Sequence, residues 1–128
     1  MPRYSHEDFR RTVLDEFPEL ADELDDDSSS PHLDMGMFAT FTQRAKGEGD
    51  WATYERCTGL VHRFFVNADK ELKNAFYVAY LEHLDFTGAR GPKAWRFFSP
   101  TLRAAWKRIT EANTRAHALP RKQKRRGS

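Results

Sequence analysis

The clearest helix signal in this chain is SPHLDMGMFATFTQRAKGEGD (Ser30–Asp50). Serine is a favoured N-cap, proline fits the first helical position, and glycine commonly ends a helix. Between these signals, apolar side chains recur at helical spacing and form one stripe: Leu33, Met37, Phe38, Phe41 and Ala45. The pattern predicts a helix that begins at Pro31 and ends at the Gly47–Gly49 pair, followed by a second helix that Asp50 caps.

Helix signals also fill the sequence on both sides of this stretch. Ser5 and Asp8 form a variant capping box before a first helix, and Pro18 ends that helix and begins a short second one. Asp69 and Ser99–Pro100 begin two later helices. No run alternates apolar and polar residues, so no strand is predicted. We therefore predict an all-α fold, a compact bundle or repeat-like array of about five to six antiparallel helices joined by short connections.

The length and the aromatic content predict a single domain with a sizeable core. The chain has 128 residues, including 10 Phe, 3 Trp and 4 Tyr. We assign residues 1–119 to one helical domain and residues 120–128 to a basic, disordered tail. The helix after Asp69 has the widest apolar stripe, so Phe76 should lie near the centre of the core. The side chains that we expect to be buried are Phe38, Phe41, Phe64, Phe76, Leu81 and Trp106.

Several classes of protein are excluded by composition. One cysteine, Cys57, rules out an intramolecular disulfide and argues against a cysteine-based zinc site. The longest uncharged apolar-rich stretch, Asn74–Leu81, has eight residues, whereas a membrane-spanning helix needs about 20. The N-terminus is polar and charged, unlike a secretory signal. We expect a soluble, cytoplasmic protein that does not insert into a membrane.

No residue pattern in the chain is typical of an active site. None of the five histidines is paired with another at the four-residue spacing of a helical metal site. Cys57 lies on an apolar helix face, which indicates a buried, inert thiol. Glu82, His83 and Asp85 are close in sequence, but such a group at a helix end is more often a capping arrangement than a ligand pair or a general-base couple. We expect no enzymatic activity, no metal and no cofactor.

The charge is distributed unevenly along the chain. Residues 1–50 carry five basic and 13 acidic residues, a balance of −8, and residues 51–128 carry 16 basic and six acidic residues, a balance of +10. The acidic side chains concentrate in one short segment that would attract a basic protein surface. This candidate partner-binding set is Asp15, Glu16, Glu19, Asp22, Glu23, Asp25, Asp26 and Asp27.

A basic region at the other end of the chain is the alternative binding surface. Its cations would contact phosphates, and aromatic residues between them would stack on unpaired bases. The candidate nucleic-acid-binding set is Lys93, Arg96, Arg103, Lys107, Arg108, Arg121, Lys122, Lys124, Arg125 and Arg126. The simplest interpretation of both charged regions is that they are solvated faces that keep the protein soluble.

Two stretches carry a family resemblance: HLDMGMFATFTQRAKGEGD (His32–Asp50) and NAFYVAYLEHLDF (Asn74–Phe86), the latter followed by AW and SPTLRAAW. Together with EFPEL (Glu16–Leu20), this layout resembles a family of small all-helical bacterial proteins catalogued only as a domain of unknown function. The resemblance spans about residues 13–110 and implies an all-helical fold similar to that of immunity proteins. It supplies no catalytic residues.

These observations lead to one main functional hypothesis and one alternative. The main hypothesis is a non-enzymatic protein-binding module, an immunity-type inhibitor of a bacterial toxin that acts by steric and electrostatic occlusion through the acidic segment. The alternative is a small nucleic-acid-associated protein that uses the basic C-terminal region. A third interpretation, an enzyme built on Glu82 and His83, has less support.

Overall fold

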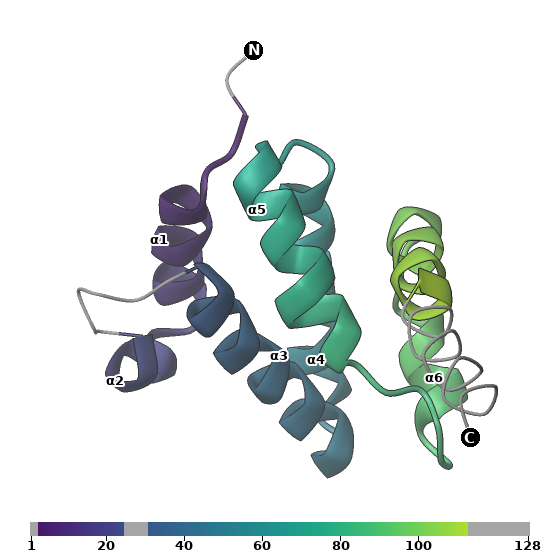
Figure 1. Cartoon of the computed structure of the whole chain (residues 1–128). Helices are drawn as coiled ribbons and strands as arrows, with labels where there is room; N and C mark the ends of the chain where they lie inside the picture. The colour runs from purple at the N-terminus through teal and green to yellow at the C-terminus, as the bar shows by residue number, and fades with distance from the viewer. Residues whose placement is uncertain (1–2, 25–30, 113–128) are drawn as a thin grey trace, which may run out of the picture.

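The computed structural model describes residues 3–24 and 31–112, and these residues are almost entirely helical (Figure 1). The all-α prediction is confirmed, because the described residues form no strand and only an isolated bridge joins Tyr4 to Ala68. A final helix covers residues 100–112. Before it, the elements in chain order are α1 (His6–Glu16), η1 (Pro18–Leu20), α2 (Ala21–Leu24), α3 (Pro31–Glu48), α4 (Trp51–Phe65), α5 (Lys70–Ala75), η2 (Phe76–Tyr80), η3 (Leu81–His83) and α6 (Gly91–Arg96).

The helix ends follow the capping signals in the sequence. Ser5 and Asp8 form a reciprocal capping box at the start of α1. The carboxylates of Asp50 and Asp69 accept backbone N–H bonds at the starts of α4 and α5, with donor–acceptor distances of 3.2 and 2.8 Å. Gly49 has a φ of 72°, a left-handed conformation that ends α3 at little steric cost. Local chemistry therefore determines where these helices begin and end.

The segment after Asp69 forms the centre of the fold. The α-helix α5 widens into a π-helical turn, η2, and then tightens into the 3₁₀ turn η3. The η2 turn packs mainly on α3, and its residue Phe76 is fully buried. The expectation that Phe76 lies in the core is confirmed.

Five of the six predicted core side chains are buried: Phe38, Phe41, Phe64, Phe76 and Leu81. The prediction for Trp106 is wrong, because its indole is only half-buried. Trp106 lies at the edge of the core beside Phe86, and its Nε1 donates a hydrogen bond to the carbonyl oxygen of Leu84 at 3.4 Å. An indole in this position keeps part of its ring in water while its N–H is satisfied.

Near the start of α3 the buried face is rotated relative to the predicted stripe, whose other members Phe38, Phe41 and Ala45 are buried as predicted. Leu33 is 57% exposed, and Met37 is only partly buried. Asp34 and Met35 are buried in their place, because α1 packs on this side and His6 Nε2 lies 2.8 Å from Asp34 Oδ2. This contact between two elements overrides the apolar pattern within α3.

Helix α6 forms a second, smaller buried cluster with the end of α3 and the start of α4, whereas Leu102 and Ala105 of the last helix belong to the main core. In Figure 1, α6 and the helix over residues 100–112 lie on the opposite side of α3 and α5 from α1 and α2. Tyr54 packs on Ala94 and donates its hydroxyl hydrogen to the Ala94 carbonyl oxygen at 3.2 Å. A Cβ at Gly91 would lie 1.8 Å from the Phe86 carbonyl oxygen, so only glycine fits there.

Among the described residues, no helix combines the length and the apolar character that a membrane span requires.

Candidate functional site

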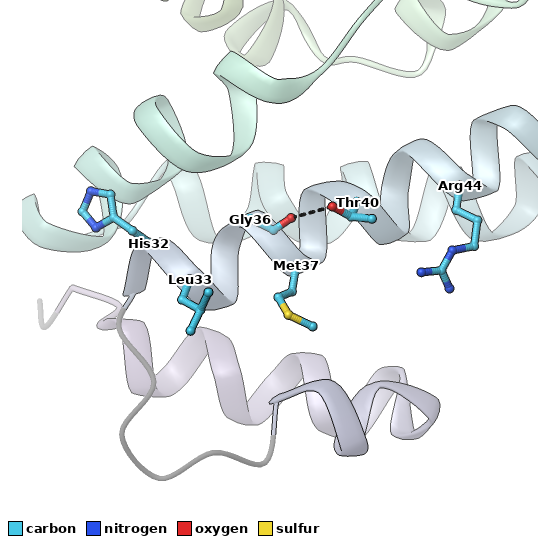
Figure 2. A pocket seen from close by; sticks show the side chains of 6 residues that line it. All are labelled: His32, Leu33, Gly36, Met37, Thr40 and Arg44. Carbon is cyan, nitrogen blue, oxygen red and sulfur yellow. Dashed lines mark hydrogen bonds between the residues drawn. The ribbon is translucent and has the colours of Figure 1, made fainter.

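A hollow follows the exposed side of α3 (Figure 2). In this view, the Leu33 and Met37 side chains extend from one side of α3 and the His32 side chain from the other. A second hollow continues from Gly36 and Thr40 towards His83. The first hollow is lined by His32, Leu33, Gly36, Met37, Thr40 and Arg44. Its lining offers a contact surface and no pair of side chains arranged for nucleophilic or acid–base chemistry.

The thiol of Cys57 is inaccessible and protonated. Its side chain is fully buried, and burial raises its pKa to about 12. The neighbouring polar groups satisfy one another, since the Tyr80 hydroxyl donates to Thr42 Oγ1 at 3.1 Å and Thr42 donates to the Phe38 carbonyl oxygen at 2.9 Å. This cluster stabilises the core and presents no nucleophile.

Two histidine contacts join elements that are far apart in the sequence. His6 on α1 and Arg10 one turn later both contact the buried carboxylate of Asp34, at 2.8 and 3.4 Å. His62 Nδ1 on α4 lies 2.7 Å from the Ser99 hydroxyl oxygen, which also accepts the Leu102 backbone N–H at the start of the last helix. Sequence spacing carries no signal for either contact, because the partners are 28 and 37 residues apart.

The Glu82, His83 and Asp85 group does not assemble into a reactive cluster. Glu82 and His83 are exposed, and the Asp85 carboxylate accepts hydrogen bonds from the backbone and the hydroxyl of Thr87. These bonds, led by that from the backbone N–H, lower the pKa of Asp85. In the part of the chain that the structure describes, no group of three or more His, Cys, Asp or Glu side chains could hold a metal ion.

The acidic candidates occupy α1, η1 and α2, and their environments differ. Asp15, Glu19 and Asp22 are exposed. Glu16 is already engaged, because its carboxylate lies 2.8 Å from Arg63 Nη2. Glu23 lies in α2. Asp25, Asp26 and Asp27 fall outside the described residues.

Tertiary folding adds carboxylates that the sequence interpretation did not include. Glu19 lines a small hollow together with Glu48, at the end of α3, and Asp50, just before α4. We name this hollow the acidic hollow and define it by its three carboxylates, Glu19, Glu48 and Asp50. Arg44 also lines it. Hydrogen bonds from the Thr53 hydroxyl and backbone lower the pKa of Asp50 below its ordinary value. Both Glu48 and Asp50 belong to the acidic half of the sequence, which is the one signal that could have suggested them.

The basic candidates that the structure describes lie on α6 and on the helix over residues 100–112. Lys93, Arg96, Lys107 and Arg108 are exposed, and Arg103 is half-buried. The remaining members of the set, Arg121, Lys122, Lys124, Arg125 and Arg126, lie outside the described residues, as does the predicted tail.

Comparison with known proteins identifies a family without identifying an activity. A family model described as a domain of unknown function (DUF7674) matches residues 10–113. No curated protein matches the chain. No solved structure matches it either.

Proposed function

The chain belongs to the DUF7674 family of unknown function, and on this premise we propose that it is a non-catalytic protein-binding module with an acidic docking surface. The observation that carries the proposal is the acidic hollow, in which Glu19, Glu48 and Asp50 converge from three elements. The three carboxylates outnumber the single cation that lines the hollow, Arg44, so a basic partner would meet an excess of negative charge there.

The exposed carboxylates around the hollow extend the same surface. Asp15 and Asp22 lie on the segment that contains Glu19, and neither forms an ion pair with another described residue. Exposed charges of one sign act over about 8 Å at physiological ionic strength and speed the encounter with an oppositely charged protein. The surface is therefore suited to fast electrostatic association.

We propose more specifically that the module acts as an immunity-type inhibitor of a bacterial toxin. Nuclease toxins need a basic surface to hold their substrate, and an acidic protein can cover such a surface. Inhibition would then follow from steric and electrostatic occlusion, with no reaction performed by this chain. The layout of Glu16–Leu20, His32–Asp50 and Asn74–Phe86, which resembles a family whose members often look like immunity proteins, suggests this more specific role.

The proposal is tested by reversing charge at the acidic surface. The double variant Glu19→Lys and Asp22→Lys should lose partner capture from the native host while its circular-dichroism spectrum stays unchanged. The matched control, Glu55→Lys and Glu71→Lys, changes the same charge at exposed positions on α4 and α5 and should capture the partner normally. For the captured protein, identified by mass spectrometry, the association rate should fall about 10-fold or more in the first variant. Equal capture by both variants, or an acidic partner, would contradict the proposal.

A second candidate function is association with nucleic acid. One observation favours it: none of the cations on α6 and on the helix over residues 100–112 forms an ion pair with a described carboxylate. From Arg90 to residue 112, both included, the chain has six basic residues and one acidic residue, Glu111. A partner with repeated negative charges would balance this surface.

A further inference from the structure

The C-terminal helices carry three cations that we name the basic strip: Arg96, Arg103 and Lys107. The structure gives defined side-chain contacts for two of them, Arg103 and Lys107. Arg103 Nε donates to the Trp95 carbonyl oxygen at 3.2 Å, and Arg103 Nη2 donates to the Arg96 carbonyl oxygen at 3.4 Å. These oxygens belong to the last turn of α6, where the helix dipole favours a positive charge. Arg103 is therefore immobilised before any ligand binds.

The indole ring of Trp95 contacts two of these cations, Arg103 and Lys107. The Arg103 Cζ atom lies 5.7 Å from the centre of the Trp95 ring, and the Lys107 Nζ atom lies 5.8 Å from it. Lys107 follows Arg103 by one helical turn, so both extend from one side of the last helix. Cations that are already ordered lose less conformational entropy when they bind an anion.

The cations of the basic strip have no described carboxylate beside them, unlike three cations on α1 and α4. Arg10, Arg11 and Arg63 each lie within 4 Å of a carboxylate of Asp34, Asp8 or Glu16, respectively. Arg96 and Lys107 are exposed, and no described carboxylate pairs with them. The neutralising charge has to come from solvent ions or from a ligand.

The aromatic rings near these cations are already in contact with other groups. Trp95 stacks on Phe98 with ring centres 6.0 Å apart, in addition to its two cations. Trp51 stacks on Phe97 at 5.7 Å, and Lys93 Nζ lies 5.0 Å from its ring centre. This arrangement argues against the stacking of bases on these rings, which the sequence analysis had considered.

From this geometry we propose that the basic strip is a preformed site for the phosphate backbone of nucleic acid, one that binds duplex without reading its sequence. The inference rests on the second candidate function and assigns it to particular residues. A nucleic acid fits better than a single anion, because the cations come from two neighbouring helices, and residues 113–128 add six Lys or Arg and no acidic residue. It also fits better than an acidic protein, because protein interfaces centre on accessible apolar anchors and the rings here are engaged.

The test measures binding of the full chain to a labelled 20-base-pair duplex by fluorescence anisotropy at several salt concentrations. The variant carries Arg96→Gln and Lys107→Gln, which leaves the Arg103 contacts to α6 intact. Each lost phosphate contact lowers the slope of log K against log salt by about 0.9, so the slope should fall by about 1.8. The matched control, Arg11→Gln and Lys70→Gln, removes the same charge from exposed positions on α1 and α5 and should keep the wild-type slope. Two duplexes of unrelated sequence should bind equally well.

The outcomes separate this inference from the function on which it rests. One outcome is that the strip variant binds duplex with the full salt slope, while binding is lost when the cations of residues 121–126 are replaced by glutamine. That result would overturn the proposal that the basic strip is the binding site and leave nucleic-acid association in place. Absence of duplex binding by the wild type at about 50 mM salt would overturn both. Binding to phosphatidylserine vesicles without binding to duplex would also overturn both, in favour of a membrane surface.

Discussion

Replacement of Phe76 by alanine should remove about 4 kcal/mol from the free energy of unfolding. The ring is fully buried in η2, and its centre lies 5.1 Å from that of Phe9, 5.9 Å from that of Phe65 and 6.4 Å from that of Tyr80. Deletion of a buried aromatic side chain costs roughly 3–5 kcal/mol, because transfer free energy is lost and a cavity remains. We expect a value inside this range because three aromatic neighbours lose their contacts at once, each worth roughly 0.5–1.5 kcal/mol beyond area burial.

The assay for this variant is urea unfolding followed by circular dichroism at 222 nm. The urea concentration at the midpoint of unfolding should fall. The slope of the free energy of unfolding against urea concentration should stay the same, because the surface exposed on unfolding hardly changes. Val66→Ala is the matched control: Val66 is 46% exposed, and its truncation should change stability by about 0.5 kcal/mol or less. If Phe76→Ala unfolds at the same urea concentration as the wild type, the η2 turn does not pack on α3 as described.

Two further predictions concern titratable groups. Burial raises the pKa of Cys57 to about 12, so Ellman's reagent at pH 8 should leave the folded protein unmodified. After denaturation in guanidinium, the reagent should react with the thiol within seconds. Rapid reaction of the folded protein would contradict the burial of Cys57. Hydrogen bonds from backbone and side-chain groups lower the pKa values of Asp8, Asp50 and Asp85. The stability that these carboxylates contribute is therefore present above about pH 4, and it is lost as the pH falls through their folded-state pKa values. The urea midpoint should therefore decrease between pH 5 and pH 3, and less so in Asp85→Asn; a midpoint that is constant over this range would refute the reasoning.

Local chemistry in the sequence determined the fold class and the helix boundaries. The capping box at Ser5, the N-caps at Asp50 and Asp69, and the Gly49 stop each act within about four residues, so they can be read without knowledge of the rest of the chain. The large core side chains could also be predicted, since residues such as Phe76 have few alternatives to burial in a chain of this size. The acidic and basic regions were visible as composition along the chain.

Tertiary packing decided which faces and which charges come together. The rotation of α3 that buries Asp34 and exposes Leu33 depends on His6, which is 28 residues away from Asp34 in the sequence. The acidic hollow needs Glu19 and Glu48 to approach across different helices, and the basic strip needs the last helix to lie against the end of α6. Periodicity describes each helix as an isolated cylinder, whereas contacts of this kind depend on the positions of two elements at once. For that reason the sequence indicated the sign and the region of each charged surface, and only the three-dimensional structure determined which side chains form it.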